Sequence, residues 1–343
     1  MTAPRIVVLA GGVGGAKFVR GVRALCRERW PDGPAGTAAS ITVVVNTGDD
    51  LWLAGLRVTP DLDSVMYALA GVNDDVRGWG RAGETERVSA ELTAYGVGWP
   101  WFTLGDLDLG THIARSAMLR DGLPLSAVTE RLTARWPLGV RLLPMTDAEV
   151  ETHVVVDEDG EERELHFEEW WVRTRAALTA KRFVQHGVAQ ATPAPGVVEA
   201  TGAADVILLA PSNPVVSIGT ILGIPGIREA LRSARAPVVG VSPVIGGAVV
   251  RGMADACLTA IGVATDAAAI ALHYGARGSG GLLDGWLVDE VDTDATGALN
   301  GAGVRSLVTP LWMTDDGASA IIVAGALGIA TAIAREKGPE TVP

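Results

Sequence analysis

The sequence predicts an α/β fold, in which a Rossmann-like, doubly wound and mainly parallel sheet carries an insertion of helices and a β-hairpin. Continuous apolar runs at residues 6–10, 41–45, 206–210 and 238–241 are typical of strands that are buried on both faces, as in parallel sheets. A loop rich in Gly, Pro, Asn or Ser follows each run, and the first and third loops lead into helical patterns. This alternation predicts a doubly wound core, whose ligands bind at the carboxyl ends of the strands.

The middle of the chain has a different pattern. Residues 74–138 have a helical pattern, and residues 140–172 turn into strands. Asp159 and Gly160 separate two short runs and predict a β-hairpin, because a tight turn needs residues that tolerate positive φ. The length of 343 residues suits a core that carries a sizeable insertion. We place the core at residues 1–74 and 191–343 and the insertion at residues 75–190.

Composition argues against several functions and locations. Glycine makes up 43 of 343 residues, which exceeds the usual share and indicates close approaches of the backbone to ligands. The formal net charge of −12 argues against nucleic acid and anionic membranes as partners. Cys26 and Cys257 are expected to be core thiols of a cytoplasmic protein without a signal peptide. The uncharged segment 318–334 is expected to be a buried helix rather than a membrane span.

The first loop is the strongest candidate for binding a phosphate. Residues 11–17 (GGVGGAK) follow the first run and open a helix, where backbone N–H groups and the helix N-terminus favour an anion. The loop is not a Walker A motif, because Phe18 stands in place of Ser or Thr, and Lys17 breaks the dinucleotide fingerprint. A tight turn for helix–sheet packing is the alternative. The candidate nucleotide contacts are Gly11, Gly12, Gly14, Gly15 and Lys17.

Four aspartates are expected at the same edge of the sheet. Asp49 and Asp50 follow the second run, and Asp61 and Asp63 lie at the start of a helix. Asp61 is expected to cap that helix, which leaves Asp63 free to face the edge. Magnesium in nucleotide sites is bound by one or two carboxylates and by substrate phosphates. We therefore expect a Mg²⁺ site that includes Asp49 and Asp63, although loop capping also explains Asp49 or Asp50 taken alone.

Two further groups of polar side chains complete the candidates. Ser212, Asn213 and Ser217 offer hydroxyl and amide groups to a second phosphate, a ribose or a base edge, and simple capping explains them equally well. His112 suits acid–base chemistry or a hydrogen bond to substrate, although a lone helical histidine is more often structural. The sequence contains no nucleophile motif and no His-rich metal motif. The residues alone therefore indicate a protein that handles a nucleotide or a diphosphate.

A series of short motifs is specific when its order is taken as a whole. The motifs are LAGGVGG at residues 9–15, VNTGDD at 45–50, PDLD at 60–63, LGD at 104–106, TH at 111–112, EWW at 169–171, APSNPVVS at 210–217 and SPVIGG at 242–247. This order resembles the 2-phospho-L-lactate transferase family (CofD and FbiA), and the tryptophan-rich insertion resembles its actinobacterial, FbiA-like phosphoenolpyruvyl transferases. The resemblance extends to about residue 335.

The resemblance implies a Mg²⁺-dependent transferase of coenzyme F-420 biosynthesis that forms a homodimer. The acceptor would be the deazaflavin Fo (7,8-didemethyl-8-hydroxy-5-deazariboflavin). The donor would be a guanosine diphosphate ester that carries a phosphoenolpyruvyl or 2-phospho-L-lactyl group. The ribityl hydroxyl of Fo would attack the phosphorus that bears the organic acid, and GMP would leave.

The resemblance also implies roles for individual residues. Asp63 is the expected catalytic residue, which orients or deprotonates the Fo hydroxyl. The expected Fo contacts are Asp50, Asp63, Thr103 and His112. The glycine loop, with Ser212, Asn213 and Ser217, would share the guanosine diphosphate. Because transfer depends mainly on positioning and electrostatics, a nucleophilic side chain is unnecessary.

Two other classes of protein have a similar glycine-rich start. One is a nucleotide-sugar-binding regulator of the gluconeogenesis-factor type, which shares the expected fold. The motifs PDLD and LGD…TH favour the transferase over this regulator. The other is an NAD-dependent oxidoreductase, which the broken fingerprint at Lys17 argues against.

Overall fold

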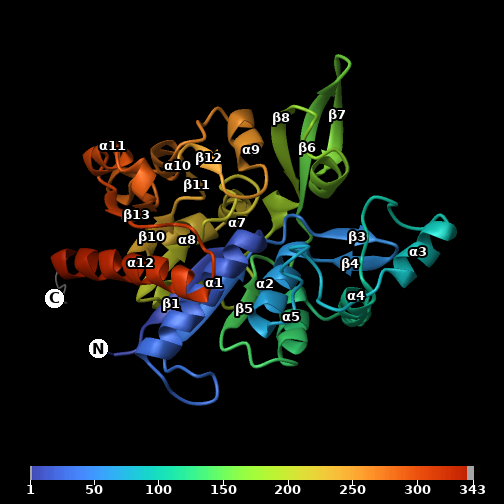
Figure 1. Ribbon diagram of the computed structural model, residues 1–343, viewed down its shortest axis with the longest axis horizontal. Helices are drawn as coiled ribbons and strands as arrows, with labels where there is room; N and C mark the ends of the chain where they lie inside the picture. Colours follow the sequence, from blue (N-terminus) through green and yellow to red (C-terminus); the bar gives the residue numbers. More distant parts are fainter. Residues whose placement is uncertain (1, 338–343) are drawn as a thin grey trace.

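The centre of the computed structural model, which describes residues 2–337, is a seven-stranded sheet in the order β14-β13-β10-β9-β1-β2-β5 (Figure 1). Every neighbouring pair in it is parallel. The predicted fold class is thus confirmed, and the four predicted strands are β1, β2, β9 and β10. The bounds of the seven strands are β1 Arg5–Ala10, β2 Ser40–Val45, β5 Arg141–Pro144, β9 Val206–Leu209, β10 Val238–Val241, β13 Gly285–Val288 and β14 Arg305–Val308.

The order of the sheet reverses beside β1. From β1 the chain runs outward through β2 to β5, and it later runs the opposite way from β9 to β14. Ala10 pairs with Val45 of β2, and Leu9 pairs with Leu209 of β9, so the three strands end at nearly the same level. The loops that follow them therefore meet at one edge. Such a switch point is where open α/β sheets bind their ligands.

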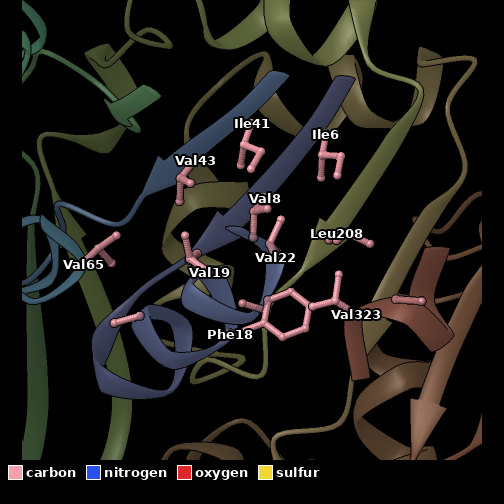
Figure 2. Packing of buried hydrophobic residues seen from close by; sticks show 14 of the residues in the cluster. Ile6, Val8, Phe18, Val19, Val22, Ile41, Val43, Val65, Leu208 and Val323 are labelled. Atoms are coloured by element: carbon pink, nitrogen blue, oxygen red, sulfur yellow. The ribbon is translucent and has the colours of Figure 1, made fainter. Parts of the chain in front are cut away.

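Helices cover both faces of the sheet. Ile6 and Val8 of β1 point into one core with α1, α2 and α12, whereas Val7 and Leu9 point into the other, as the two-residue period of a strand requires. Figure 2 shows Phe18, Val19 and Val22 of α1 packed against Ile6 and Val8. The covering helices are α1 Gly12–Arg29, α2 Pro60–Ala70 and α12 Asp316–Lys337 on the first face, and α6 Val197–Ala203, α7 Ile218–Gly223, α8 Ile227–Ser233, α10 Ala267–Tyr274 and α11 Ala295–Gly301 on the second.

Helix α12 lies along α1. A Cβ added at Gly21 of α1 would lie 2.4 Å from Cβ of Ser319 in α12, so glycine permits this close contact. Ile322, Val323 and Ala326 of α12 are buried in the same core. Within the described residues, α12 is the one helix that is long and apolar enough to cross a membrane, and half of the relevant segment is buried in the fold. This packing agrees with the expected buried helix.

The insertion forms a helical part and a small sheet. The hairpin β3 Leu51–Leu53 and β4 Leu56–Val58 packs against the insertion through Leu104 and Leu109. The hairpin that the sequence predicts around Asp159 and Gly160 is confirmed. It consists of β6 Glu151–Glu158 and β7 Glu161–His166, with positive φ at both turn residues. Strand β8 (Ala180–His186) completes this sheet in the order β7-β6-β8, which stands away from the core in Figure 1. The insertion helices are α3 Arg87–Ala94, α4 Asp106–Arg120 and α5 Leu125–Thr133, followed by the π-helical segment η1 Glu169–Arg173.

The predicted boundary of the insertion needs a correction. Strand β5 lies within residues 75–190, yet it pairs with β2 as the edge strand of the central sheet. Its apolar run is only Leu142 and Leu143, which is too short to mark a core strand in the sequence. The outermost positions of the predicted core, residue 1 and residues 338–343, lie outside the described part. The remaining short elements are η2 Val188–Gln190, β11 Val244–Ile245, β12 Ala248–Val249, α9 Ala254–Ala260, η3 Arg277–Ser279 and η4 Glu290–Asp292.

Candidate active site at the switch point of the sheet

A cavity of about 890 Å³ opens at the carboxyl edge of the sheet. The loops after β1, β2, β9 and β10 form one side of it, and α2, α4 and the insertion form the other. Most of the predicted site residues line it together: Gly11, Gly12, Gly14, Lys17, Asp49, Asp63, Thr103, His112, Ser212, Asn213 and Ser217. The other two, Gly15 and Asp50, are buried and do not line it.

The glycine loop is held by side chains from two other strands' loops. Ser212 accepts a hydrogen bond from the N–H of Gly11 at 3.0 Å and donates to its carbonyl oxygen at 2.7 Å. A Cβ at Gly11 would lie 2.4 Å from Oδ2 of Asp61 and 2.8 Å from Cβ of Ser217, so this position requires glycine. Because the hydroxyl of Ser212 donates its proton to the carbonyl oxygen of Gly11, Ser212 is a residue that positions Gly11.

Asp61 has a different role from the one that its sequence position predicts. The residue before helix α2 is Thr59, and Asp61 is already inside the first turn. Its Oδ1 accepts from the N–H of Gly12 at 2.7 Å, and its Oδ2 accepts from Nδ2 of Asn46 at 2.9 Å. The expectation that Asp61 caps α2 is therefore wrong. Its carboxylate instead joins the loops that follow β1 and β2, through the N–H of Gly12 and the side chain of Asn46.

Three carboxylates gather beside this loop without a basic partner. Asn46 donates from one Nδ2 to both Asp61 and Asp49, the latter at 3.1 Å, and Oδ1 of Asp49 has no hydrogen-bond partner in the described chain. Burial, Asp61 and Glu168 raise the pKa of Asp49 well above its ordinary value. Burial raises the pKa of Asp61 to about 6, and burial with the Asp61 charge raises the pKa of Glu168 to about 8.

This acidic group fits a divalent cation. Like charges that are buried together are stabilised by protons or by a metal ion. The unpartnered oxygen of Asp49 supplies a free lone pair, and oxygen ligands are those that Mg²⁺ prefers. Asp63, by contrast, already has a cationic partner in Arg115. Asp61 is therefore a further candidate ligand beside the expected Asp49 and Asp63, and Asp63 also belongs to a group with Asp108 and His112 whose ligand atoms lie within 4.8 Å of one another.

A second polar network lies around Asp63, which also lines the cavity. Oδ1 of Asp63 forms a short ion pair with Nη2 of Arg115, and Oδ2 accepts from the hydroxyl of Thr59 at 3.2 Å. Nη1 of Arg115 donates to Nδ1 of His112 at 2.9 Å. Because a guanidinium can only donate, the imidazole proton lies on Nε2, which is 3.3 Å from Oδ1 of Asp108.

The electrostatics of Asp63 suit a proton acceptor. Burial raises the pKa of Asp63 above its ordinary value, and the charge of Arg115 opposes that shift. Asp63 and His112 both line the cavity, although each is almost fully buried. The pair of Arg115 and Thr59 fixes the direction of the carboxylate. His112 thus joins this network through Nδ1, whereas its Nε2, on the side of Asp108, has no hydrogen-bond partner among the described residues.

Asp50 lies deeper than its neighbours. Its Oδ2 is 3.6 Å from Nη2 of Arg57, and both residues are buried. Burial raises the pKa of Asp50 well above its ordinary value, although Arg57 and Arg115 lower it. Because Asp50 does not line the cavity, the structure does not bring it to the ligand surface with Asp49.

The remaining predicted nucleotide contacts differ in their surroundings. Oδ1 of Asn213 accepts from the N–H groups of Val215 and Val216, at 2.9 Å and 3.2 Å, so this side chain shapes the loop before α7. Lys17 is exposed at the rim, and its Nζ lies 3.5 Å from the carbonyl oxygen of Met313. Lys17 is therefore free to turn toward an anion at the mouth of the cavity.

Aromatic side chains form another part of the cavity wall. Trp101 and Phe102 come from the insertion, Trp171 comes from η1, and Trp312 comes from the segment before α12. Trp99 supports Trp101 from outside the cavity, with stacked rings whose centroids are 4.6 Å apart. A wall of this kind offers flat apolar surfaces to a planar ring.

Sequence reasoning missed three residues of this site. Asp61 is explained in the sequence by helix capping, and the hydrogen bond to Gly12 appears only in three dimensions. Arg115 stands three residues after His112, a spacing that places both on one helix face and could have indicated a pair. Glu168 directly precedes the EWW motif, and no local signal distinguishes it from the other acidic residues of the hairpin.

These features define a Rossmann-like α/β protein with an acidic and aromatic ligand cavity at the switch point of a parallel sheet. The chain belongs to the 2-phospho-L-lactate transferase CofD family, whose family model matches residues 6–302. The resemblance inferred from the motifs is thereby confirmed, and the protein is assigned to a family of transferases.

Relatives of known name agree with this assignment. The phosphoenolpyruvate transferases of Streptomyces griseus and Streptomyces coelicolor are 57% and 58% identical to this chain over 326 residues, which cover 95% of it and 98% of each relative. The phosphoenolpyruvate transferase of Thermobifida fusca is 57% identical over the same length. A UPF0052-family protein of Bacillus halodurans superimposes with a TM-score of 0.59 at 18% identity, over 94% of this chain and 99% of its own, which shows the fold alone.

Proposed function

We propose that this protein transfers a phosphoenolpyruvyl or 2-phospho-L-lactyl group from a guanosine diphosphate ester to the ribityl hydroxyl of Fo, in the biosynthesis of coenzyme F-420. The observation that carries the proposal is one cavity that is lined both by the glycine loop with its carboxylates and by aromatic side chains. The glycine loop and the carboxylates suit a diphosphate with its cation, and the aromatic side chains suit a planar ring. The family membership and the names of the relatives support the same reaction.

The diphosphate of the donor would lie along the glycine loop. The N–H of Gly12 already donates to Asp61, so the next N–H groups of the first helical turn, those of Val13 and Gly14, are the ones that can meet a phosphate. Asp49 and Asp61 would hold Mg²⁺ next to this loop. When it is bound, the ion neutralises charge that develops on the leaving GMP phosphate.

The acceptor would enter from the aromatic side. Trp101, Phe102 and Trp171 offer stacking surfaces to the deazaflavin ring, and Thr103 follows them on the insertion side. The ribityl chain would then extend toward Asp63 and His112. Asp50 is placed behind this surface by its pairing with Arg57, so its contribution would be to hold the loop rather than to contact Fo.

The chemical step needs one new bond and one proton acceptor. The ribityl oxygen forms a bond to the phosphorus that bears the organic acid, and the bond from this phosphorus to the bridging oxygen of GMP breaks. Oδ2 of Asp63 accepts the hydroxyl proton, while Arg115 and Thr59 hold the carboxylate in place. Fixing both reactants in one water-poor cavity supplies most of the remaining acceleration.

Mass spectrometry of the product tests this function directly. The full chain is incubated with Fo, Mg²⁺ and each guanosine diphosphate ester in turn, and product and GMP are quantified. A product whose mass exceeds that of Fo by one phosphoenolpyruvyl or phospholactyl group is expected, with one GMP per product. No product from either donor would overturn the proposal.

Calorimetry distinguishes the alternative, a nucleotide-sugar-binding regulator of the gluconeogenesis-factor type. Binding of Fo and GDP is expected, whereas tight binding of a UDP-sugar without Fo binding would favour the regulator. A homodimer and a cytoplasmic location stay predictions, and light scattering and cell fractionation test them.

A further inference from the structure

A group of ionisable side chains lies outside the cavity, on the sheet formed by β7, β6 and β8. We call it the histidine face, and it consists of Glu151, His153, Glu164, His166 and His186. Three of the five histidines of the chain are in it. The sequence alone does not indicate this group, because its members are spread over three strands and lack the short spacing of a metal motif.

Strand register brings these residues to one side. His153 pairs with His166 across β6 and β7, and Glu151 pairs with His186 across β6 and β8. Glu164 stands two residues before His166, so it points to the same side. The opposite side of this sheet packs into the protein through Val154, Val156 and Leu165. The histidine face is therefore the other side of this sheet, on which Glu164 and His186 are exposed and His166 is buried.

Three ligand atoms converge on this face. One nitrogen of His153, one nitrogen of His186 and one carboxylate oxygen of Glu164 lie within 4.8 Å of one another. Nδ1 of His153 is 3.2 Å from Oε1 of Glu164, and the same oxygen makes a short contact with Nε2 of His186. Ligands of one tetrahedral ion, each about 2 Å from it, are separated by about this distance.

Two further observations mark this group as more than an ion pair. Nε2 of His153 is 3.4 Å from Oε2 of Glu151, which is the carboxylate–histidine arrangement that orients a metal-binding imidazole. His166, which is 8% exposed, accepts from the N–H of Glu168 through Nδ1, and its Nε2 has no hydrogen-bond partner among residues 2–337. A buried polar atom without a partner thus lies in the same patch, with its ring 5.4 Å from that of His153.

We propose that His153, Glu164 and His186 bind Zn²⁺, with Glu151 orienting His153 and a fourth position open to solvent. Two neutral imidazoles and a carboxylate favour Zn²⁺ over Mg²⁺, which prefers an all-oxygen set. The ion tethers β8 to the hairpin of β6 and β7, across which these three residues are distributed. Because this sheet leads into Phe167 and Glu168 of the cavity wall, the ion stabilises that wall from outside.

The test is a Zn²⁺ titration of the full chain, without a histidine tag and freed of metal by a chelator. One Zn²⁺ per chain is expected in calorimetry, with a rise in melting temperature and no competition from millimolar Mg²⁺. Co²⁺ in place of Zn²⁺ is expected to show the visible absorption of a four-coordinate site. His186→Gln and Glu164→Gln are each expected to weaken Zn²⁺ binding by roughly 10-fold or more. Both residues are at least two-fifths exposed, so the variants keep the fold.

A matched control separates this site from other histidines. His273→Gln, in α10 on the second face of the central sheet, is expected to keep full Zn²⁺ affinity. The double variant Asp49→Asn/Asp61→Asn is also expected to keep it, which distinguishes the site from the Mg²⁺ group of the cavity. Unchanged Zn²⁺ affinity in both His186→Gln and Glu164→Gln, or binding that does not saturate, would overturn the proposal.

Discussion

Asp61 accepts a hydrogen bond of 2.7 Å from the backbone N–H of Gly12, so a carboxylate occupies the N–H group at the start of helix α1. A bare phosphate at the same place would meet Asp61, Asp49 and Glu168, which all carry raised pKa values because they are buried together. A cation between phosphate and carboxylates removes this conflict. The loop is therefore organised for a metal–phosphate complex rather than for a phosphate alone.

Replacing Asp61 tests this arrangement. Asp61→Asn keeps an oxygen for Gly12 and removes one charge from the acidic group, so the activity at limiting Mg²⁺ is expected to fall by roughly 10–100-fold. The melting temperature without metal is expected to rise, since a buried repulsion is relieved. Activity measured against Mg²⁺ concentration checks the first effect, with Asp121→Asn at the exposed end of α4 as control. An unaltered Mg²⁺ dependence would exclude Asp61 as a ligand.

Asp63→Asn is expected to reduce both turnover and stability. Turnover should fall roughly 10²-fold or more, because the proton acceptor is lost. The free energy of unfolding should fall by about 3–5 kcal/mol, because Arg115 is left as a buried charge without its partner. Steady-state kinetics and denaturant unfolding measure the two effects.

A double variant separates the two roles of Asp63. Asp63→Asn/Arg115→Met removes both charges, and it should recover much of the stability that Asp63→Asn loses without recovering turnover. If Asp63→Asn alone turns over at nearly the wild-type rate, Asp63 does not act at the reaction centre.

Gly11→Ala should disrupt the glycine loop. The new Cβ would lie 2.4 Å from Oδ2 of Asp61 and 2.8 Å from Cβ of Ser217, both of which are held by packing. GDP binding measured by calorimetry is expected to weaken, and the melting temperature is expected to fall. Gly328→Ala in α12, where a Cβ meets nothing within 4 Å, is the matched control and should preserve both. Equal GDP affinity in the two variants would contradict the close packing at Gly11.

Both cysteines should be unreactive in the folded protein. Burial raises the pKa of Cys26 and of Cys257 to about 12, so neither forms a thiolate at pH 8. Titration with a chromogenic disulfide reagent is expected to detect no thiol in the native chain and two thiols after denaturation. Rapid reaction of one native thiol would show that its surroundings open.

The strands that could be predicted share one property, which is an apolar run of several residues that a loop motif directly follows. Strand β1 contains five consecutive apolar residues before a glycine loop, strand β2 contains four apolar residues and Thr42 before an asparagine loop, and both were predicted. Strand β13 begins with Gly285 and contains only three apolar residues. This pattern is too short to predict a strand, and its pairing with β10 shows the strand only in the structure. The same holds for β5, whose two leucines are recognised as part of a strand only through their pairing with β2.

The site was predictable in its loops and less so in its pairings. The loops after β1, β2 and β9 meet because parallel strands end together, which the pattern indicates. The partner of each carboxylate depends on contacts over long sequence separations, such as Asp61 with Gly12 and Asp63 with Arg115. A capping position and a position that binds the glycine loop have the same local sequence, so only the tertiary structure distinguishes them.

The contact of α1 with α12 has a consequence for how the chain is made. Strand β1 and helix α1 leave the ribosome before α12, which covers their apolar face. All strands of the central sheet must be synthesised before Phe18 of α1 can pack with Val323 of α12. Pairing of such distant segments is slow and leaves apolar surface exposed on the nascent chain. Premature termination before α12 should therefore yield aggregation rather than a smaller folded protein.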